Sequence, residues 1–445
     1  MRLRNRYAAA AALVLASFAL FGCESGRKRP PQVTVQVVHA AAERGSIELR
    51  RIQWAETRPP LEFRTASSQF RFDVDEYEFN AYIQPPGTTD WELLGSFTVS
   101  LTPETDYLFV LTEANGDFEP IVVESSAERR NDRSHIVAVH AAPSLGPMSI
   151  YVEPSDVDPT AVAPLATLSF GDSVNDATRA PGEYRFVLTE AGNPANVLMR
   201  SDEIELEAGV AYSFTIVDPA DDTVAPISVV MAGTAPSVIY DESVGALAHV
   251  INAAADREPR DLYAGEELEE KLVDAAPPLT EVVVEVPTGS QTISVTPAGN
   301  TGVVEAEAEP AIAATRHYTF LVSGEAGKLR ISTPVDDRRV LAEHARLRFL
   351  NAANRLEPLE VFVLPPDIDI EDVPGPNFTL AAPGSSPRIN LPTGDYDLVL
   401  RDSESEEIVA GPLRVSLDEG IYTVLIANGA EPDTAEIIYL DDFLE

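Results

Sequence analysis

The sequence predicts an all-β protein built from four tandem antiparallel β-sandwich domains with an immunoglobulin-like or transthyretin-like outline. A strand-like segment ending in His-Ala-Ala or Asn-Ala-Ala occurs four times, at residues 35–41, 136–142, 248–254 and 347–353. Regular self-similarity of this kind indicates a repeat architecture. Each copy continues with short apolar segments separated by Pro, Gly, Asn and Asp, and helical periodicity is almost lacking. A β-barrel in each repeat is the alternative architecture.

A near-constant spacing between two later strands supports the repeat. The first of these strands carries Tyr77, Tyr184, Gln291 and Tyr396 at equivalent places, and the second carries Tyr107, Tyr212, Tyr318 and Tyr422. The separations are 30, 28, 27 and 26 residues. Each module is therefore about 100 residues long, a size that can bury a core of its own.

The repeats define the expected domain boundaries. We predict β-sandwich repeats at residues 33–124, 135–231, 246–335 and 345–441, preceded by a lipoprotein signal peptide at 1–22 and a tether at 23–32. The polar segment 125–134 is a linker, and 232–245 is the longest connection, which divides the chain into two pairs. Linker composition favours hinges between the repeats. In the third repeat, residues 266–273 are patterned for one or two helical turns.

The charge of the chain excludes one large class of partners. The formal net charge is −40 at pH 7, with lysine only at Lys28, Lys271 and Lys328. Nucleic-acid affinity depends on cationic contacts to phosphate, so we expect no nucleic-acid partner.

The N-terminus has the features of a secretory signal. Arginines at positions 2, 4 and 6 precede an apolar run from Ala8 to Leu20 that is too short to span a bilayer. Leu20, Gly22 and Cys23 then resemble the lipobox of bacterial lipoproteins. This resemblance implies that the Cys23 thiol carries a diacylglycerol and that acyl chains anchor the protein to a membrane. Glu24 in place of an inner-membrane retention aspartate favours the outer membrane. The alternative is an ordinary signal peptide with an incidental cysteine.

The polar residue that ends each opening strand is the main candidate for a shared role. The four positions are His39, His140, Asn252 and Asn351. Asparagine does not titrate near neutral pH and is a poor zinc ligand, so a role common to all four copies must be hydrogen bonding. Residues two and four positions earlier are apolar in every copy, which places the polar side chain at the end of a buried face. We predict a structural hydrogen bond to the loop after Ala-Ala, and no catalytic residue, metal ligand or cofactor.

Other candidate chemistry has a plainer alternative. Trp54 and Trp91 could stack on sugar rings, although core or rim packing is the commoner role. Acidic loops around Asp156, Asp172 and 367–372 could meet calcium, but their spacing lacks the glycine and glutamate of the calcium-loop pattern. Hydrolase, zinc-protease, phosphate-binding and dinucleotide motifs do not occur in the sequence.

The repeat resembles the bacterial domain of unknown function 4397. The best matches are residues 140–143 (His-Ala-Ala-Pro), 150–152 (Ile-Tyr-Val) and 181–184 (Pro-Gly-Glu-Tyr). The resemblance implies β domains that are secreted or attached to the cell envelope, and it implies no particular activity. Our hypothesis is a non-catalytic envelope lipoprotein that acts as a four-domain spacer or binding array for a protein or glycan. The alternatives are a calcium-dependent adhesion or matrix protein and an envelope hydrolase with an interdomain site.

Overall fold

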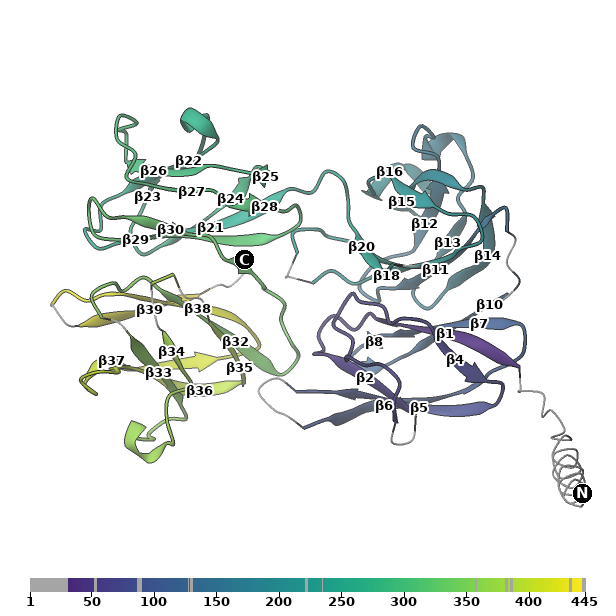
Figure 1. The fold of residues 1–445 in the computed structure, drawn as a ribbon, viewed down its shortest axis with the longest axis horizontal. Helices are drawn as coiled ribbons and strands as arrows, with labels where there is room; N and C mark the ends of the chain where they lie inside the picture. The colour runs from purple at the N-terminus through teal and green to yellow at the C-terminus, as the bar shows by residue number, and fades with distance from the viewer. Residues whose placement is uncertain are drawn as a thin grey trace, which may run out of the picture.

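The computed structural model confirms an all-β chain of successive β-sandwiches. It describes residues 31–441 apart from 52–53, 86–89, 127, 129–130, 221–222, 234, 357, 381–382, 385–386 and 432–433. Four two-sheet units follow one another along the chain, and units 1 and 2 lie on the opposite side of the molecule from units 3 and 4 (Figure 1). Within the described residues, none of the helices has the length and apolar character needed to cross a membrane.

The first half of the chain forms units 1 and 2. Unit 1 consists of β1 (Gln32–His39), β2 (Ile47–Arg51), β3 (Trp54–Ala55), β4 (Phe70–Asp73), β5 (Glu76–Ile83), β6 (Glu92–Ser100), β7 (Thr105–Leu111), β8 (Glu113–Ala114), β9 (Asp117–Phe118) and β10 (Ile121–Ser126). Unit 2 consists of β11 (Ser134–Ala141), β12 (Met148–Glu153), the 3-10 helix η1 (Pro159–Ala161), β13 (Ala166–Leu168), β14 (Ser173–Arg179), β15 (Gly182–Glu190), β16 (Asn193–Arg200), β17 (Ile204–Leu206), β18 (Ala211–Val217), β19 (Ser228–Ala232) and β20 (Ser237–Ile239).

The second half forms units 3 and 4. Unit 3 consists of β21 (Ala246–Ala254), β22 (Arg260–Ala264), η2 (Glu266–Leu268), β23 (Glu270–Ala276), β24 (Glu281–Val286), β25 (Gly289–Ser290), β26 (Ile293–Pro297), β27 (Ala306–Ala308), β28 (Ala311–Ile312), β29 (His317–Gly324), β30 (Arg330–Ser332) and β31 (Val335–Asp336). Unit 4 consists of β32 (His344–Asn351), β33 (Leu359–Leu364), η3 (Ile370–Asp372), β34 (Phe378–Leu380), β35 (Arg388–Pro392), β36 (Gly394–Asp402), β37 (Ile408–Leu417), β38 (Gly420–Asn428) and β39 (Ala435–Asp441). Only one 3-10 turn forms in the predicted helical segment 266–273, because residues 270–273 join β23.

All four units share one strand order. In unit 1 the sheets run β10-β7-β1-β4 and β3-β2-β5-β6, and in unit 4 they run β35-β32-β38-β39 and β34-β33-β36-β37. Units 2 and 3 repeat this order, with β17 and β20 as additions in unit 2 and β31 as an addition in unit 3. The opening strand of each unit, which carries the His or Asn at or near its end, is therefore a central strand of its sheet.

One strand pair in each unit is parallel, which the sequence-based prediction of an antiparallel fold did not anticipate. The parallel pairs are β1 with β7, β11 with β18, β21 with β29, and β32 with β38. Parallel neighbours need a long crossover connection. The whole second sheet lies between the two strands in the chain and supplies that crossover. The sequence did not predict the parallel pair because apolar periodicity carries no information about strand direction.

Alternating apolar side chains fill the space between the two sheets. Val33, Val35 and Val37 of β1 point into the core of unit 1, as the two-residue strand period requires. Phe79 and Phe109 meet there edge to face with ring centroids 5.1 Å apart. Each of the other units has an equivalent core of its own.

The tyrosines that mark the second spaced strand hold the preceding turn in every unit. The hydroxyl oxygens of Tyr107, Tyr212, Tyr318 and Tyr422 accept hydrogen bonds from the backbone N–H of Thr102, Glu207, Ala313 and Asp418, at 2.9, 3.0, 2.8 and 3.0 Å. Immunoglobulin-like sandwiches use a tyrosine corner in the same way. The constant spacing in the sequence therefore has a structural cause.

The units pack face to face in two pairs. The outer face of β1 and β7 contacts the outer face of β11 and β18 through a buried cluster formed by Val38, Ala40, Phe63, Leu108, Val110, Val123, Val137, Val139, Ala141, Val217 and Val230. Units 3 and 4 share a second cluster formed by Ile251, Ala253, Leu321, Leu350, Ala352 and Leu425. The expected hinges within these pairs are therefore wrong, because apolar surface on both sides of the linker is buried.

Candidate functional site

The two candidate histidines are fully buried and bond to the loop that follows them. His39 Nε2 lies 2.9 Å from Gly45 O, and the backbone N–H of Ala41 donates to His39 Nδ1 at 3.3 Å. In unit 2, His140 Nε2 lies 3.0 Å from Gly146 O, and the N–H of Ala142 donates to His140 Nδ1 at 3.4 Å. Both rings thus bond to the residues two and six positions further along the chain.

The two asparagines occupy the same place. Asn252 Nδ2 donates to Glu258 O at 2.9 Å, and Asn252 Oδ1 accepts from the N–H of Ala254 at 3.3 Å. Asn351 Oδ1 accepts from the N–H of Ala353 at 3.1 Å. These four positions lie in four different strands, β1, β11, β21 and β32, one in each unit, so the structure does not bring them together into one site.

Burial controls the protonation of His39. Desolvation lowers its pKa from 6.5 to about 3; the bond to Gly45 opposes this shift, and the positive charge of Arg339 adds to it. A neutral ring with no exposed surface cannot contact a substrate. Cys23, the predicted lipidation site, lies outside the described residues.

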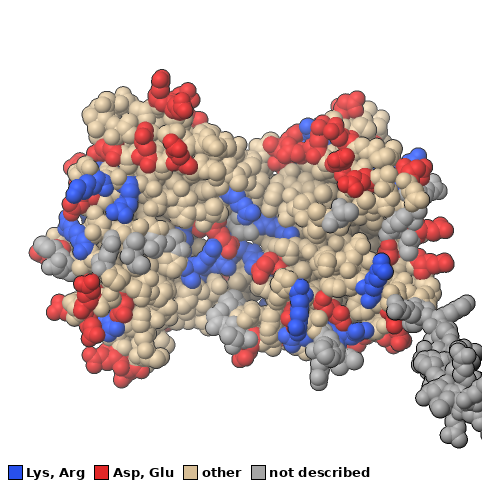
Figure 2. Space-filling view, viewed as in Figure 1, with Lys and Arg blue, Asp and Glu red and all other residues tan. Residues whose placement is uncertain are grey.

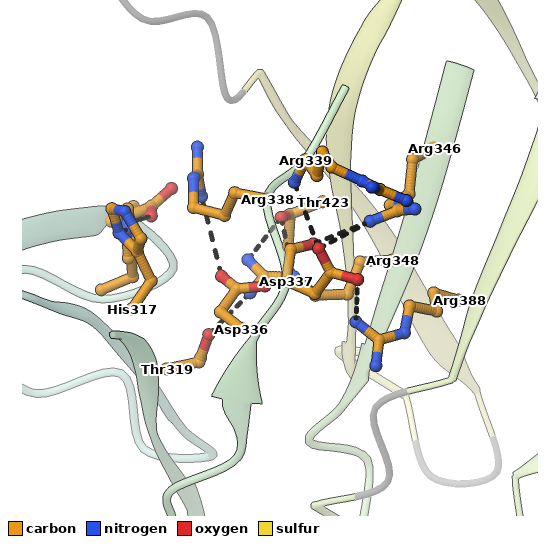
Figure 3. A network of polar contacts seen from close by, with 12 residues as sticks. His317, Thr319, Asp336, Asp337, Arg338, Arg339, Arg346, Arg348, Arg388 and Thr423 are labelled. Atoms are coloured by element: carbon orange, nitrogen blue, oxygen red, sulfur yellow. Dashed lines mark hydrogen bonds and ion pairs between the residues drawn. The ribbon is translucent and has the colours of Figure 1, made fainter. Parts of the chain in front are cut away.

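A buried ionic network joins units 3 and 4. Arg348 of β32 forms an ion pair with Asp336, and the side chains of the two residues are 6% and 2% exposed. Its guanidinium also donates to Thr319 Oγ1 at 2.7 Å and to Thr423 Oγ1 at 2.6 Å, and Figure 3 shows these groups converging from both units. Buried charges need such partners, so the network fixes how the two units dock.

Further polar groups extend this network toward its edge. Arg346 Nη1 lies 3.0 Å from Asp337 Oδ1, and Arg388 Nη1 lies 3.4 Å from Asp337 Oδ2. Burial alone would raise the pKa of Asp337, but the arginines and the Arg339 amide outweigh burial, so the pKa is lowered. Asp337 therefore stays ionised.

A histidine pair lies on the unit 3 side of the same interface. His249 Nε2 is 3.2 Å from His317 Nδ1, and His249 Nδ1 contacts the Glu281 carboxylate. Desolvation, assisted by the neighbouring His249 and Arg338, lowers the pKa of His317 to about 4. His249 thus bonds to both His317 and Glu281, and the three side chains form one polar cluster at the interface.

The linker between units 3 and 4 also contacts units 1 and 2. The N–H of Ala342 donates to Glu43 O at 2.9 Å, and Arg339 lies 5.4 Å from the Phe63 ring centroid. Thr223 Oγ1 of unit 2 donates to Thr315 O of unit 3 at 2.8 Å. On the face shown in Figure 2, several basic side chains lie in the middle together with a few acidic ones, and acidic side chains predominate at the top and bottom. Arginine thus balances the strongly acidic chain where the units meet.

A groove with a volume of about 810 Å³ lies between units 1 and 2. Its polar walls come from β1, from the segment leading into β4, and from the backbone before β18 and after β19. The side chains on the unit 1 wall include Gln32, Thr34, Gln36, Ser67, Ser68, Gln69, Arg71 and Asp106. Amide and hydroxyl groups of this kind fix the orientation of ligands in binding sites.

A smaller cavity of about 50 Å³ continues from this groove into the interface. Thr34, Gln36, Gln69, Asp106 and Ala211 line both spaces. The cavity also reaches Ser213 of β18, a residue that is 8% exposed. Among the described residues, the buried Ser213 hydroxyl has no hydrogen-bond partner.

The acidic loops use their carboxylates in local turns. Asp158 Oδ1 accepts from the N–H of Thr160 at 2.8 Å, and Asp172 Oδ2 accepts from the N–H of Ser169 at 3.0 Å. In the last unit, Asp369 caps η3. The part of the chain that the structure describes contains no group of three or more His, Cys, Asp or Glu side chains able to hold a metal ion.

Of the two tryptophans, the structure describes the side chain of Trp91. Arg50 lies 5.3 Å from the centroid of the half-buried Trp91 ring and 4.2 Å from that of Tyr82. This stack covers Trp91 from one side. The side chain of Trp54 lies outside the described residues.

Comparison with known proteins identifies a family in part of the chain. Residues 246–362 match the model of a domain of unknown function (DUF4397). This range covers unit 3 and the first strands of unit 4, so the resemblance inferred from the repeat is confirmed for a domain within it. No curated protein matches the chain.

Several solved structures show a distant likeness. The Bacillus anthracis TIE protein is 10% identical, with 90% of this chain and 69% of that chain covered and a TM-score of 0.16. A family 26 carbohydrate-binding module of Eubacterium rectale Amy13K, in complex with maltoheptaose, is 11% identical over 46% and 98%, with a TM-score of 0.17. BcpA, the major pilin subunit of Bacillus cereus, is 9% identical over 90% and 100%, with a TM-score of 0.16. At these scores none is a guide to the function of this chain.

The interface residues are those that sequence reasoning missed. His249 and Arg348 each lie three positions before the Asn that ends the opening strand, and so point away from the core of their own unit. A polar or charged residue on the face of a central strand that points away from the core of its own unit indicates that a neighbouring unit buries this face too. Asp336 carries no comparable local signal.

Proposed function

We propose that this protein is a non-catalytic, lipid-anchored protein of the bacterial cell envelope that binds a protein or glycan partner between its first two units. The observation that carries the proposal is the groove of about 810 Å³ at the junction of units 1 and 2. Concave, partly polar spaces between domains are common places for ligands.

A binding role also fits the state of the polar residues. The titratable groups between units 3 and 4 are held in ion pairs, and His39 and His140 are fully buried. General acid–base catalysis needs a group within hydrogen-bond reach of a substrate. The arrangement therefore favours recognition over chemical conversion.

The proposed acyl anchor would hold this recognition at a membrane. The signal sequence and Cys23 support attachment by acyl chains, and residues 24–32 supply a short tether before β1. The proposed location is the outer membrane, where the four units project from the bilayer.

Membrane attachment is tested by radiolabelled palmitate and by fractionation of cell envelopes. We expect the full chain to incorporate palmitate and to sediment with outer membranes. The Cys23→Ala variant should lose both the label and the membrane association. Equal labelling of the variant, or recovery of the wild-type chain in the soluble fraction, would contradict the anchor.

Binding is tested by affinity capture from detergent-solubilised envelope extracts with the full mature chain. We expect a specific partner that is lost when Gln69→Trp narrows the groove and retained in the matched unit 4 surface variant Arg388→Trp. Turnover of an envelope substrate by the purified chain, with no partner captured, would overturn the proposed function.

A further inference from the structure

Units 1 and 2 meet in the same way as units 3 and 4, so equivalent positions can be compared. Two positions in each unit face the partner unit near the polar end of the contact. One lies three residues before the His or Asn of the opening strand, and the other directly follows the spaced tyrosine. In units 3 and 4 these positions hold His249, Thr319, Arg348 and Thr423, and in units 1 and 2 they hold Gln36, Leu108, Val137 and Ser213.

In the second pair the Arg348 guanidinium fills this place. It donates to Thr319 Oγ1 and Thr423 Oγ1 from opposite sides and pairs with the Asp336 carboxylate. The hydroxyls of Thr319 and Thr423 therefore both have a donor to accept from, although both residues are fully buried.

In the first pair, the small cavity lies at the place that the Arg348 guanidinium fills in the second pair. Gln36, Leu108, Val137 and Ser213 all line it. Val137 stands where Arg348 stands in unit 4, and Ser213 stands where Thr423 stands, so the hydroxyl remains and the guanidinium is missing. This explains why, among the described side chains, the Ser213 hydroxyl is buried without a partner.

We propose that an arginine side chain of a partner polypeptide enters the groove between units 1 and 2 and places its guanidinium in this cavity. The guanidinium donates to Ser213 Oγ and shares the carboxylate of Asp106, which lines both the cavity and the groove and already has another interaction within the chain. The peptide carrying it lies extended along the groove. This proposal rests on the proposed function and specifies its ligand.

The net charge of the chain and the residues that line the cavity favour an arginine side chain over a neutral glycan. A net charge of −40 attracts cationic partners and raises their rate of encounter. Arg71, the cation of the wide groove, does not line the small cavity. The planar guanidinium matches a site that offers a carboxylate, a hydroxyl and an amide oxygen.

Calorimetric titration of the full mature chain tests the proposal with three extended pentapeptides that differ only in the central residue: arginine, citrulline or lysine. Citrulline keeps the shape of arginine without its charge. We expect the arginine peptide to bind roughly tenfold tighter than the citrulline peptide or more, since hydrogen bonds to charged groups are the stronger ones. Equal binding of the two, or no binding of the arginine peptide, overturns the proposal.

Variants identify the cavity as the place of binding. Ser213→Ala and Asp106→Asn should each weaken the arginine peptide roughly tenfold, and Val137→Arg should abolish binding by supplying the guanidinium from within the chain. Ser416→Ala, at an exposed hydroxyl of unit 4, is the matched control. If circular dichroism shows that Val137→Arg does not fold, the affinity of Ser213→Ala for the arginine peptide tests the proposal. Unchanged affinity in Ser213→Ala and Asp106→Asn overturns the proposal.

The same titration separates failure of this proposal from failure of the proposed function. A partner that is captured from envelope extracts but binds Ser213→Ala as well as the wild type leaves the binding role intact and removes the arginine site. Competition by a neutral oligosaccharide, with no preference for arginine over citrulline, assigns the groove to a glycan and also overturns the proposal.

Discussion

The interface between units 1 and 2 and the interface between units 3 and 4 have the same geometry but different contents. Both bury an apolar cluster near the His-Ala-Ala or Asn-Ala-Ala end of the opening strand. At the other end, units 3 and 4 enclose Arg348 with Asp336, whereas units 1 and 2 leave a groove of about 810 Å³. One pair is therefore closed by its own side chains, whereas the other keeps an open groove, which is where we propose that a ligand binds.

The closed pair should depend strongly on its buried arginine. Replacing Arg348 with alanine leaves the Asp336 carboxylate buried and without its main partner, which costs about 3–5 kcal/mol in comparable cases. We expect urea unfolding of the full chain to show a separate early transition from units 3 and 4, while units 1 and 2 unfold as in the wild type. Tryptophan fluorescence reports on unit 1, because both tryptophans lie there.

Arg388→Ala is the matched control for this experiment. Arg388 pairs with Asp337 at 3.4 Å, but its side chain is 51% exposed. Exposed ion pairs contribute little, about 0–1 kcal/mol. Equal effects of the two variants would show that the Arg348 network is not what closes the second pair.

The strand-end position makes the open pair sensitive to acid, because His39 lies there whereas the closed pair has Asn252 and Asn351. The folded pKa of His39 is about 3 against an ordinary value of 6.5. Below pH 6.5 the unfolded chain therefore binds a proton that the folded chain does not. Above pH 6.5, His39 does not lower the free energy of unfolding. Between pH 6.5 and 3, protonation of His39 in the unfolded chain lowers this free energy by about 1.4 kcal/mol per pH unit.

His39→Asn is the variant that tests this sign. Asparagine makes the equivalent bonds in unit 3, so we expect the variant to fold. Its free energy of unfolding should fall by about 2 kcal/mol less than that of the wild type between pH 6.5 and 5. Chemical unfolding at several pH values measures it. If the free energy of unfolding of the variant depended on pH as it does in the wild type, a buried neutral His39 would be contradicted.

The smallest expected effects concern equivalent hydroxyls in the two pairs. Thr423→Val removes an acceptor for Arg348 and should destabilise the chain by about 1–2 kcal/mol. Ser213→Ala removes a hydroxyl with no partner among the described residues and should be neutral or stabilising by up to about 1 kcal/mol. Thermal melting of both variants compares them directly. A cost for Ser213→Ala equal to that for Thr423→Val would show that the first interface is already satisfied.

The sequence was sufficient for the fold class because each unit repeats its own local signals. Val33, Val35 and Val37 alternate as a half-buried strand does, and Tyr107 and its counterparts keep their distance because each closes the same turn. Such signals arise within one unit and are copied with it. The parallel partner of each opening strand was not predictable, because it depends on which distant segment lies beside it.

The pairing of units and the candidate groove were beyond local patterns. Val38 and Leu350 face away from their own cores, and only the neighbouring unit makes that burial favourable. The missing guanidinium opposite Ser213 is likewise visible only when Val137 and Arg348 are superposed as equivalent positions. Sequence periodicity identifies which face a residue lies on, but not what covers that face.

A crystal structure of the full mature chain with the arginine pentapeptide tests the difference between the two interfaces most directly. We predict a guanidinium in the cavity beside Val137, within about 3 Å of Ser213 Oγ, in the orientation that Arg348 adopts against Thr423. A peptide bound elsewhere on the molecule, with the cavity free of any cationic group, would contradict the role assigned to the first pair.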